Sequence, residues 1–207
     1  MLKTEVQMWY YALFAWRERK ETRGENQTFS FHKNSVYWGL FLMFLHEQIL
    51  EGAGLHFVLH RTSPFWAWIV TALHVYTVIW LIGDYKAIRH SRFCLIDEKL
   101  ELRVGFRKSV TVELSNIAYI GSVKTSLEQM SIETDAFHAE ACPRLAPDMG
   151  LADEPQFEIE LHEPVLSGGL FGRKQLIRKL YIRVDEPSVF LQSIKKHMCY
   201  TSYRKYT

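Results

Sequence analysis

The chain has 207 residues, and its 25 Lys and Arg against 23 Asp and Glu give a formal net charge of +2. So small a net charge argues against bulk nucleic-acid binding, and the length suits one soluble domain beside a membrane segment. The cysteines Cys94, Cys142 and Cys199 are odd in number and form no C-x-x-C pair, so neither a disulfide framework nor a zinc knuckle is indicated.

The first unit, residues 1–34, predicts a helix over 4–20 followed by a polar loop. Residues 8–16 are rich in aromatic side chains but too few to span a bilayer, and Arg17, Arg19 and Lys20 follow them. Two interpretations stand: an interfacial helix with its rings among lipid headgroups, or an amphipathic helix docked on the helical hairpin expected over residues 35–90. The run lacks a small-residue cleavage site, so no cleavable signal peptide is predicted.

The first long apolar segment covers residues 36–59. It is unbroken from Val36 to Leu45, and two acids follow, each costing roughly 2.5–3.5 kcal/mol at mid-membrane. Four residues share one helical face: Glu47, Glu51, Gly54 and Val58. That face is predicted to pack on the next helix near Thr71, His74 or Tyr76, with His74 bonded to a carboxylate. A re-entrant or interfacial helix is the alternative to a full span.

The second apolar segment, residues 64–83, is more uniform. Residues 65–82 would reach about 27 Å as a helix, close to the ~30 Å hydrocarbon core. Tryptophans lie near both of its ends, as at membrane interfaces. Residues 60–64 leave room only for an antiparallel reversal, so residues 35–90 predict a transmembrane helical hairpin.

The charges around this hairpin predict its orientation. Basic residues flank it on both sides, whereas its turn holds only Arg61: Lys3, Arg17, Arg19, Lys20, Arg23, Lys33, Lys86, Arg89 and Arg92. The positive-inside rule then places both termini in the cytoplasm of a multi-pass cell-membrane protein.

Residues 91–207 predict a cytosolic β-domain. Apolar and polar residues alternate over 99–104, 109–114, 157–162 and 177–184, as in half-buried strands, and short strands are also expected at 92–96 and 130–133. Residues 125–155 look like a long irregular excursion. A helix is predicted over 186–199. The expected fold is an α+β membrane protein whose small antiparallel β-barrel or two-sheet domain is closed by a C-terminal helix.

Four stretches carry a family resemblance: residues 81–87 (LIGDYKA), 100–105 (LELRVG), 169–173 (GLFGR) and 184–190 (VDEPSVF). Over roughly residues 36–200 the layout resembles bacterial membrane proteins with a transmembrane hairpin followed by a pleckstrin-homology-like (bacterial PH) domain. The resemblance implies a binding scaffold rather than an enzyme. The basic Lys-x(n)-Arg-x-Arg signature of phosphoinositide-binding relatives is absent, so inositide binding is not expected.

The last part of the chain is basic, and its loop at 168–174 combines apolar tips with cations. Leu170, Phe171, Arg173 and Lys174 are the candidates for contact with lipid or a partner protein. A solvated strand face, balanced by the acidic stretch before it, is the alternative.

Within the hairpin, the intramembrane polar candidates are Glu47, Glu51 and His74. A metal site would draw on four histidines: His46, His56, His60 and His74. No H-E-x-x-H or Glu-x-x-His pattern supports one, so no metal, cofactor or catalytic residue is predicted. The leading hypothesis is a non-enzymatic binding or assembly protein that contacts lipid, with a second copy or another membrane protein as partner. The alternatives are a membrane metalloenzyme and a transport-linked subunit in which Glu47 and Glu51 carry protons or cations through an oligomer.

Overall fold

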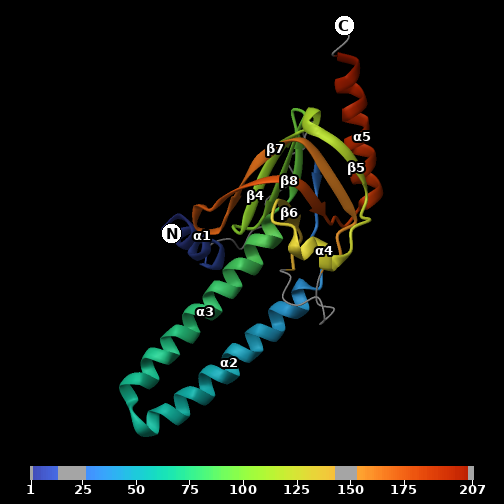
Figure 1. Cartoon of the computed structure of the whole chain (residues 1–207). Helices are drawn as coiled ribbons and strands as arrows, with labels where there is room; N and C mark the ends of the chain where they lie inside the picture. Colours follow the sequence, from blue (N-terminus) through green and yellow to red (C-terminus); the bar gives the residue numbers. More distant parts are fainter. Residues whose placement is uncertain (1, 14–26, 143–152, 205–207) are drawn as a thin grey trace.

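A curled half-barrel sheet and two long helices that project from it dominate this mixed α+β chain (Figure 1). The computed structural model describes residues 2–13, 27–142 and 153–204. Its helices are α1 (Leu2–Leu13), α2 (Tyr37–Thr62), α3 (Pro64–His90), α4 (Leu127–Ile132) and α5 (Pro187–Arg204), with short 3-10 turns η1 (Leu114–Asn116) and η3 (Leu170–Gly172). Its strands are β1 (Gln27–Phe29), β2 (Phe93–Ile96), β3 (Lys99–Val104), β4 (Lys108–Glu113), β5 (Ile117–Ser122), β6 (Ala136–Ala139), β7 (Phe157–Gly169) and β8 (Lys174–Ile182).

Helices α2 and α3 run antiparallel and are separated by Ser63 alone. Ser63 is extended, and Pro64 begins α3 at a position where a missing backbone N–H does no harm. The reversal lies within the predicted turn, but both helices are longer than predicted. Helix α3 continues beyond Gly83 to His90 and delivers the chain directly to β2.

The two helices differ in composition. Within the described residues, α3 alone is long and apolar enough to cross a membrane, with a mean hydropathy of 1.8 over a window that is only 6% buried. Helix α2 carries Glu47 and Glu51 and does not reach this level. The expected pair of spans is therefore supported for α3 only.

The face of α2 that meets α3 is not the predicted one. Glu47 and Glu51 are exposed, and a side chain added at Gly54 would meet nothing within 4 Å. The contact instead follows Gln48, Gly52 and His56, four residues apart. Burying Glu47 or Glu51 against α3 without a hydrogen-bond donor would cost free energy. Gly52, in contrast, has no side chain and lets the two helices approach closely.

Polar side chains bridge the helices along this face. The Thr71 hydroxyl donates to the Ala67 carbonyl at 2.8 Å, so His56 Nδ1, at 2.7 Å, donates to Thr71 Oγ1. His74 Nδ1 lies 3.2 Å from Gln48 Oε1. The predicted inter-helix bond of His74 is thus made to the amide of Gln48 and not to Glu47 or Glu51.

Two glycines of α2 provide a matched test of this packing. A Cβ at Gly52 would lie 3.1 Å from His74 Cβ, whereas Gly54 faces open space. Leucine gains roughly 1 kcal/mol of helix propensity at either site. We expect Gly52→Leu to lose about 1–3 kcal/mol of unfolding free energy through overpacking, and Gly54→Leu to lose none. Chemical unfolding in detergent, followed by tryptophan fluorescence, measures both; equal behaviour of the two variants would contradict the packing described here.

The sheet has the order β1-β2-β3-β4-β7-β8-β6, with β5 paired to β7. Strands β2, β3 and β4 form the predicted meander, and Asp97 and Glu98 make its first turn with φ of 46° and 61°, the left-handed pair of a tight hairpin. The long β7 pairs with β4 at its end and with β5 and β8 along its length. Strand β6 adds a parallel edge to β8.

Three local predictions are wrong. Residues 27–29, expected in a loop, form β1 and pair with β2. Residues 130–133, expected as a strand, belong largely to α4, which Ser126 caps by accepting a hydrogen bond from the Gln129 N–H. The excursion at 125–155 holds α4 and β6; its residues 143–152 lie outside the described part of the chain, as do residues 14–20 of the predicted first helix.

Helix α5 closes one end of the sheet, as predicted, although it begins and ends later than expected. Phe190 is fully buried between Phe29 and Phe157, with ring centroids at 5.1 and 5.6 Å. Asp185, just before this helix, accepts hydrogen bonds from the Lys33 and Asn34 N–H groups. Burial by itself would raise the pKa of the Asp185 carboxyl, but these hydrogen bonds favour the charged form and the net effect is a lowered pKa. The same bonds connect the segment before α2 to the end of the sheet.

Helix α1 docks against α3, the second of the two interpretations of the N-terminal segment. A Cβ at Gly83 would lie 2.8 Å from the Met8 carbonyl oxygen, so only glycine lets α1 approach this closely. Lys86 Nζ donates to the Ala12 carbonyl at 2.9 Å. The outer side of α1 leaves Val6 and Tyr10 exposed.

Candidate functional site

A buried ion pair joins the projecting helices to the sheet. Asp84, fully buried on α3, accepts a hydrogen bond from Arg107 Nε at 2.8 Å on Oδ1, and Arg107 Nη2 donates to Oδ2. Tyr37 donates its hydroxyl hydrogen to the same carboxylate, and Arg107 Nη1 donates to the Ala141 carbonyl at 3.1 Å. We refer to Tyr37, Asp84 and Arg107 as the junction cluster.

The junction cluster connects three parts of the chain that are far apart in sequence. Tyr37 begins α2, Asp84 lies on α3, and Arg107 lies in the β3–β4 turn, with its guanidinium 5.0 Å from the centre of the Tyr37 ring. Burial alone would lower the pKa of Arg107, but the Asp84 carboxylate outweighs it and the net shift is upward. The guanidinium therefore stays charged, and its hydrogen bonds join α2 and α3 to the β3–β4 turn.

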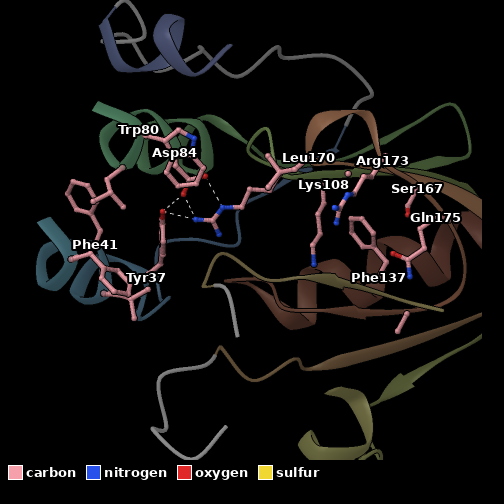
Figure 2. Close-up of a pocket in the computed structure, with 17 residues that line it drawn as sticks. Tyr37, Phe41, Trp80, Asp84, Lys108, Phe137, Ser167, Leu170, Arg173 and Gln175 are labelled. Carbon is pink, nitrogen blue, oxygen red and sulfur yellow. Dashed lines mark hydrogen bonds and ion pairs between the residues drawn. The ribbon is translucent and has the colours of Figure 1, made fainter. Parts of the chain in front are cut away.

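A cavity of about 510 Å³ opens beside this cluster, between the helices and the mouth of the half-barrel (Figure 2). We call it the junction pocket. One part of its wall is apolar: Leu40, Phe41, Phe44, Trp80, Leu81, Phe137 and Leu170. The polar and basic residues come from the sheet side of the pocket, where Phe137 and Leu170 also lie: Lys108, Ser167, Arg173 and Gln175. Figure 2 shows the helix residues Phe41 and Trp80 on one side and the strand residues on the other.

The basic wall lies on the inner face of the sheet. Along β4, Lys108 has the same parity as the buried Val110 and Val112, and strand residues two apart point to one face. Arg173 and Gln175 likewise precede the buried Ile177. The inward-facing positions of β4 and β8 are therefore apolar deep in the half-barrel, whereas Lys108 and Arg173 stand at its open end, near the helices.

The predicted lipid-contact loop lies at this same end of the domain. Leu170 lines the junction pocket and packs with Trp80 in the small cluster around Met8. Phe171 is 47% exposed, and its φ of 58° is a left-handed conformation that is uncommon for a bulky residue. Arg173 and Lys174 are exposed. The loop and the outer side of α1 therefore flank the exit of α3 from the domain.

The predicted metal residues do not converge. His56 and His60 stack with ring centroids 5.4 Å apart, His74 bonds to Gln48, and His46 is exposed. Within the described residues, no three His, Cys, Asp or Glu side chains lie close enough to hold a metal ion.

The thiol nearest the junction cluster is a poor nucleophile. Burial and the neighbouring Asp153 raise the pKa of Cys142 to about 11, so the thiol is protonated at neutral pH. Its N–H donates to the Asp153 carboxylate at 3.0 Å. The polar groups of the junction region thus hold one another and the backbone, an arrangement suited to positioning a ligand or a helix.

The junction cluster was missed by sequence reasoning. Asp84 marked the end of an apolar run, and nothing in the pattern linked it to Arg107. Lys108 carries a signal in the sequence, because a lysine stands at the position of the alternating pattern that Val110 and Val112 continue with apolar residues.

Comparison with protein families, with curated proteins and with solved structures finds no match to this chain.

Proposed function

We propose that this protein is a membrane-anchored binding protein: α2 and α3 insert in the bilayer, and a PH-like β-domain lies at its cytoplasmic surface. The observation that carries the proposal is the apolar surface of the projecting helices. Thirteen large apolar side chains on α2 and α3 are 40–69% exposed: Trp38, Leu42, Met43, Ile49, Leu50, Phe57, Val58, Phe65, Trp66, Trp68, Leu73, Val75 and Tyr76. Soluble monomers rarely expose a contiguous apolar surface of this extent.

The proposed spans are residues 64–83 of α3 and 36–59 of α2. Helix α2 inserts as the partner of α3, because its bridging groups Gln48 and His56 are satisfied by α3. Trp66 and Trp68 at the far end and Trp38 and Trp80 near the domain occupy the two interfacial levels. The basic residues before α2 and after α3 then place the domain in the cytoplasm.

Glu47 and Glu51 remain exposed on α2 in this arrangement. Each ionised acid facing lipid would cost roughly 2.5–3.5 kcal/mol on insertion scales. A second copy of the chain, or another membrane protein, is therefore proposed to cover this face of α2 and to satisfy both carboxylates.

The PH-like assignment rests on the order of the elements. An antiparallel meander precedes a second set of strands, the sheet curls on itself, and α5 plugs one end with Phe190. Such a domain is a binding scaffold, and the mutually engaged groups of the junction cluster favour binding over catalysis.

Alkaline carbonate extraction of cell membranes tests the proposal. We expect the native chain to stay in the membrane fraction, and Leu73→Arg/Val75→Arg to be lost from it, because each arginine adds about 2.5–3.5 kcal/mol at a helix centre. Val189→Arg, at an exposed apolar position of α5, is the control and should stay with the membrane. A native chain that is freely soluble without detergent would overturn the proposal.

A further inference from the structure

The face of α2 that is turned away from α3 carries a seven-residue repeat. Met43, Leu50 and Phe57 lie seven residues apart along the helix, and all three side chains are exposed. Building on the membrane placement proposed above, we infer that two copies of this chain form a parallel dimer through this face. His46 of each copy then donates a hydrogen bond to Glu51 of the other.

The repeat matches the contact positions of a coiled coil. With Met43, Leu50 and Phe57 at heptad position d, position a holds Glu47 and Gly54. Side chains at a and d form the contact between helices that wind around each other in a left-handed sense, and most transmembrane bundles have this geometry. A Cβ at Gly54 would meet nothing within 4 Å, so this glycine can admit a partner helix at close range.

Helix α3 occupies the opposite side of α2. Its contacts are with Gln48, Gly52 and His56, which fall at heptad positions b, f and c. Helix α1 packs on α3 (Figure 1). The a and d positions of α2 therefore remain exposed after α1 and α3 have packed, and they are available to a second molecule.

The polar residues that flank the a and d positions favour a second copy of the same chain as the partner. His46 falls at position g, and Glu51 falls at the following position e. In a parallel dimer, a residue at g faces the residue at the following e position of the other helix. Among the described residues, neither of these two side chains makes a hydrogen bond or an ion pair within its own chain. Two-fold symmetry forms the contact between His46 and Glu51 twice, because each copy supplies both partners.

Glu47, at position a, meets its own copy at the two-fold axis. Two carboxyl groups that share a site do not both ionise, and the one that keeps its proton can donate a hydrogen bond to the other. A polar residue at a single a position also fixes the register and the number of helices. The dimer therefore supplies hydrogen-bond donors to both exposed acids of α2, Glu47 and Glu51.

Oxidative cross-linking in isolated membranes tests this inference on single-cysteine variants of the full chain, made after the three native cysteines are replaced by serine. Leu50→Cys should yield a disulfide-linked dimer, whereas Ile49→Cys, its exposed neighbour at position c, should yield none. The difference is expected because cysteines whose Cα atoms lie more than about 7 Å apart cannot be bridged. Phe57→Cys and Leu55→Cys, at positions d and b, form a second matched pair with the same expected outcome.

A charge exchange tests the contact between His46 and Glu51 itself, with the dimer measured by energy transfer between labelled copies in liposomes. His46→Glu places a carboxylate opposite Glu51 and should weaken the dimer on the order of thirtyfold, through loss of one inter-helix hydrogen bond in each of the two symmetric contacts. His46→Glu/Glu51→His exchanges donor and acceptor and should recover the affinity to within about threefold of the native value. Ile49→Glu adds the same acid outside the contact face and is the matched control, with an expected change of less than about threefold.

Two results would overturn the inference: cross-linking of Ile49→Cys as readily as Leu50→Cys, and no recovery of the dimer in the exchanged double variant. Failure of the dimer is distinguishable from failure of the membrane proposal. A chain that resists carbonate extraction but yields no cross-linked dimer through Leu50→Cys contradicts only the dimer, and leaves another membrane protein as the partner of this face. A chain that is soluble without detergent contradicts the membrane placement itself.

Discussion

Asp84→Ala is expected to lower the free energy of unfolding by about 3–5 kcal/mol. The substitution leaves the Arg107 guanidinium buried beside the Tyr37 hydroxyl, without the carboxylate that accepts hydrogen bonds from its Nε and Nη2. A buried charge that has lost its partner retains the full cost of its lost hydration. Chemical unfolding in detergent micelles, followed by tryptophan fluorescence, measures the change.

The same experiment contains its own controls. Arg107→Ala should cost a comparable amount, and Asp84→Leu/Arg107→Met should be closer to the native protein than either single alanine variant, because no charge is left unpaired. Lys99 and Glu113 form an exposed ion pair at 3.6 Å, with side chains 52% and 63% exposed. Lys99→Ala should change stability by less than about 1 kcal/mol. An Asp84→Ala variant as stable as Lys99→Ala would contradict the role of the junction cluster.

Phe190→Ala is expected to lower the free energy of unfolding by about 3–5 kcal/mol through the cavity that it leaves. The ring is fully buried and touches both β1, through Phe29, and β7, through Phe157. Its loss should loosen α5 and β1 together, because both depend on this contact. Hydrogen exchange followed by mass spectrometry should show faster exchange in both segments.

The neighbouring Val189 is the control for this prediction. Its side chain is 48% exposed on the same helix, so Val189→Ala should change stability by less than about 0.5 kcal/mol. If Phe190→Ala were equally mild, α5 would not close the sheet in the way described.

Much of the sheet could be predicted because its pattern is local. Alternation over residues 99–104 and 109–114 matches β3 and β4, since each strand buries one face. Strand β1 was missed because three residues are too short to show a period, and β6 because its pairing with β8 joins distant parts of the chain. Local propensity also favoured a strand where Ser126 instead caps α4.

The site was harder to predict than the fold. The spacing of Glu47 and Glu51 suggested one packing face on α2, but periodicity does not state which face meets a neighbour. Gly52, the residue that permits contact with His74, carries no side chain and adds nothing to a polarity pattern. The pairing of Asp84 with Arg107 depends on how the β3–β4 turn folds back against α3, which is a property of tertiary structure alone.

The orientation of the helical pair is the most direct test of the whole account. Ser63 lies at the far end of α2 and α3, whereas Lys99 lies in the β-domain. Single cysteines at these two positions, introduced after replacement of Cys94, Cys142 and Cys199 by serine, can be labelled with a membrane-impermeant maleimide in intact spheroplasts and in inverted vesicles. We predict that Ser63→Cys is labelled only in spheroplasts and Lys99→Cys only in inverted vesicles. Labelling of both positions from the same side would show that the helices do not cross the bilayer and would contradict the account.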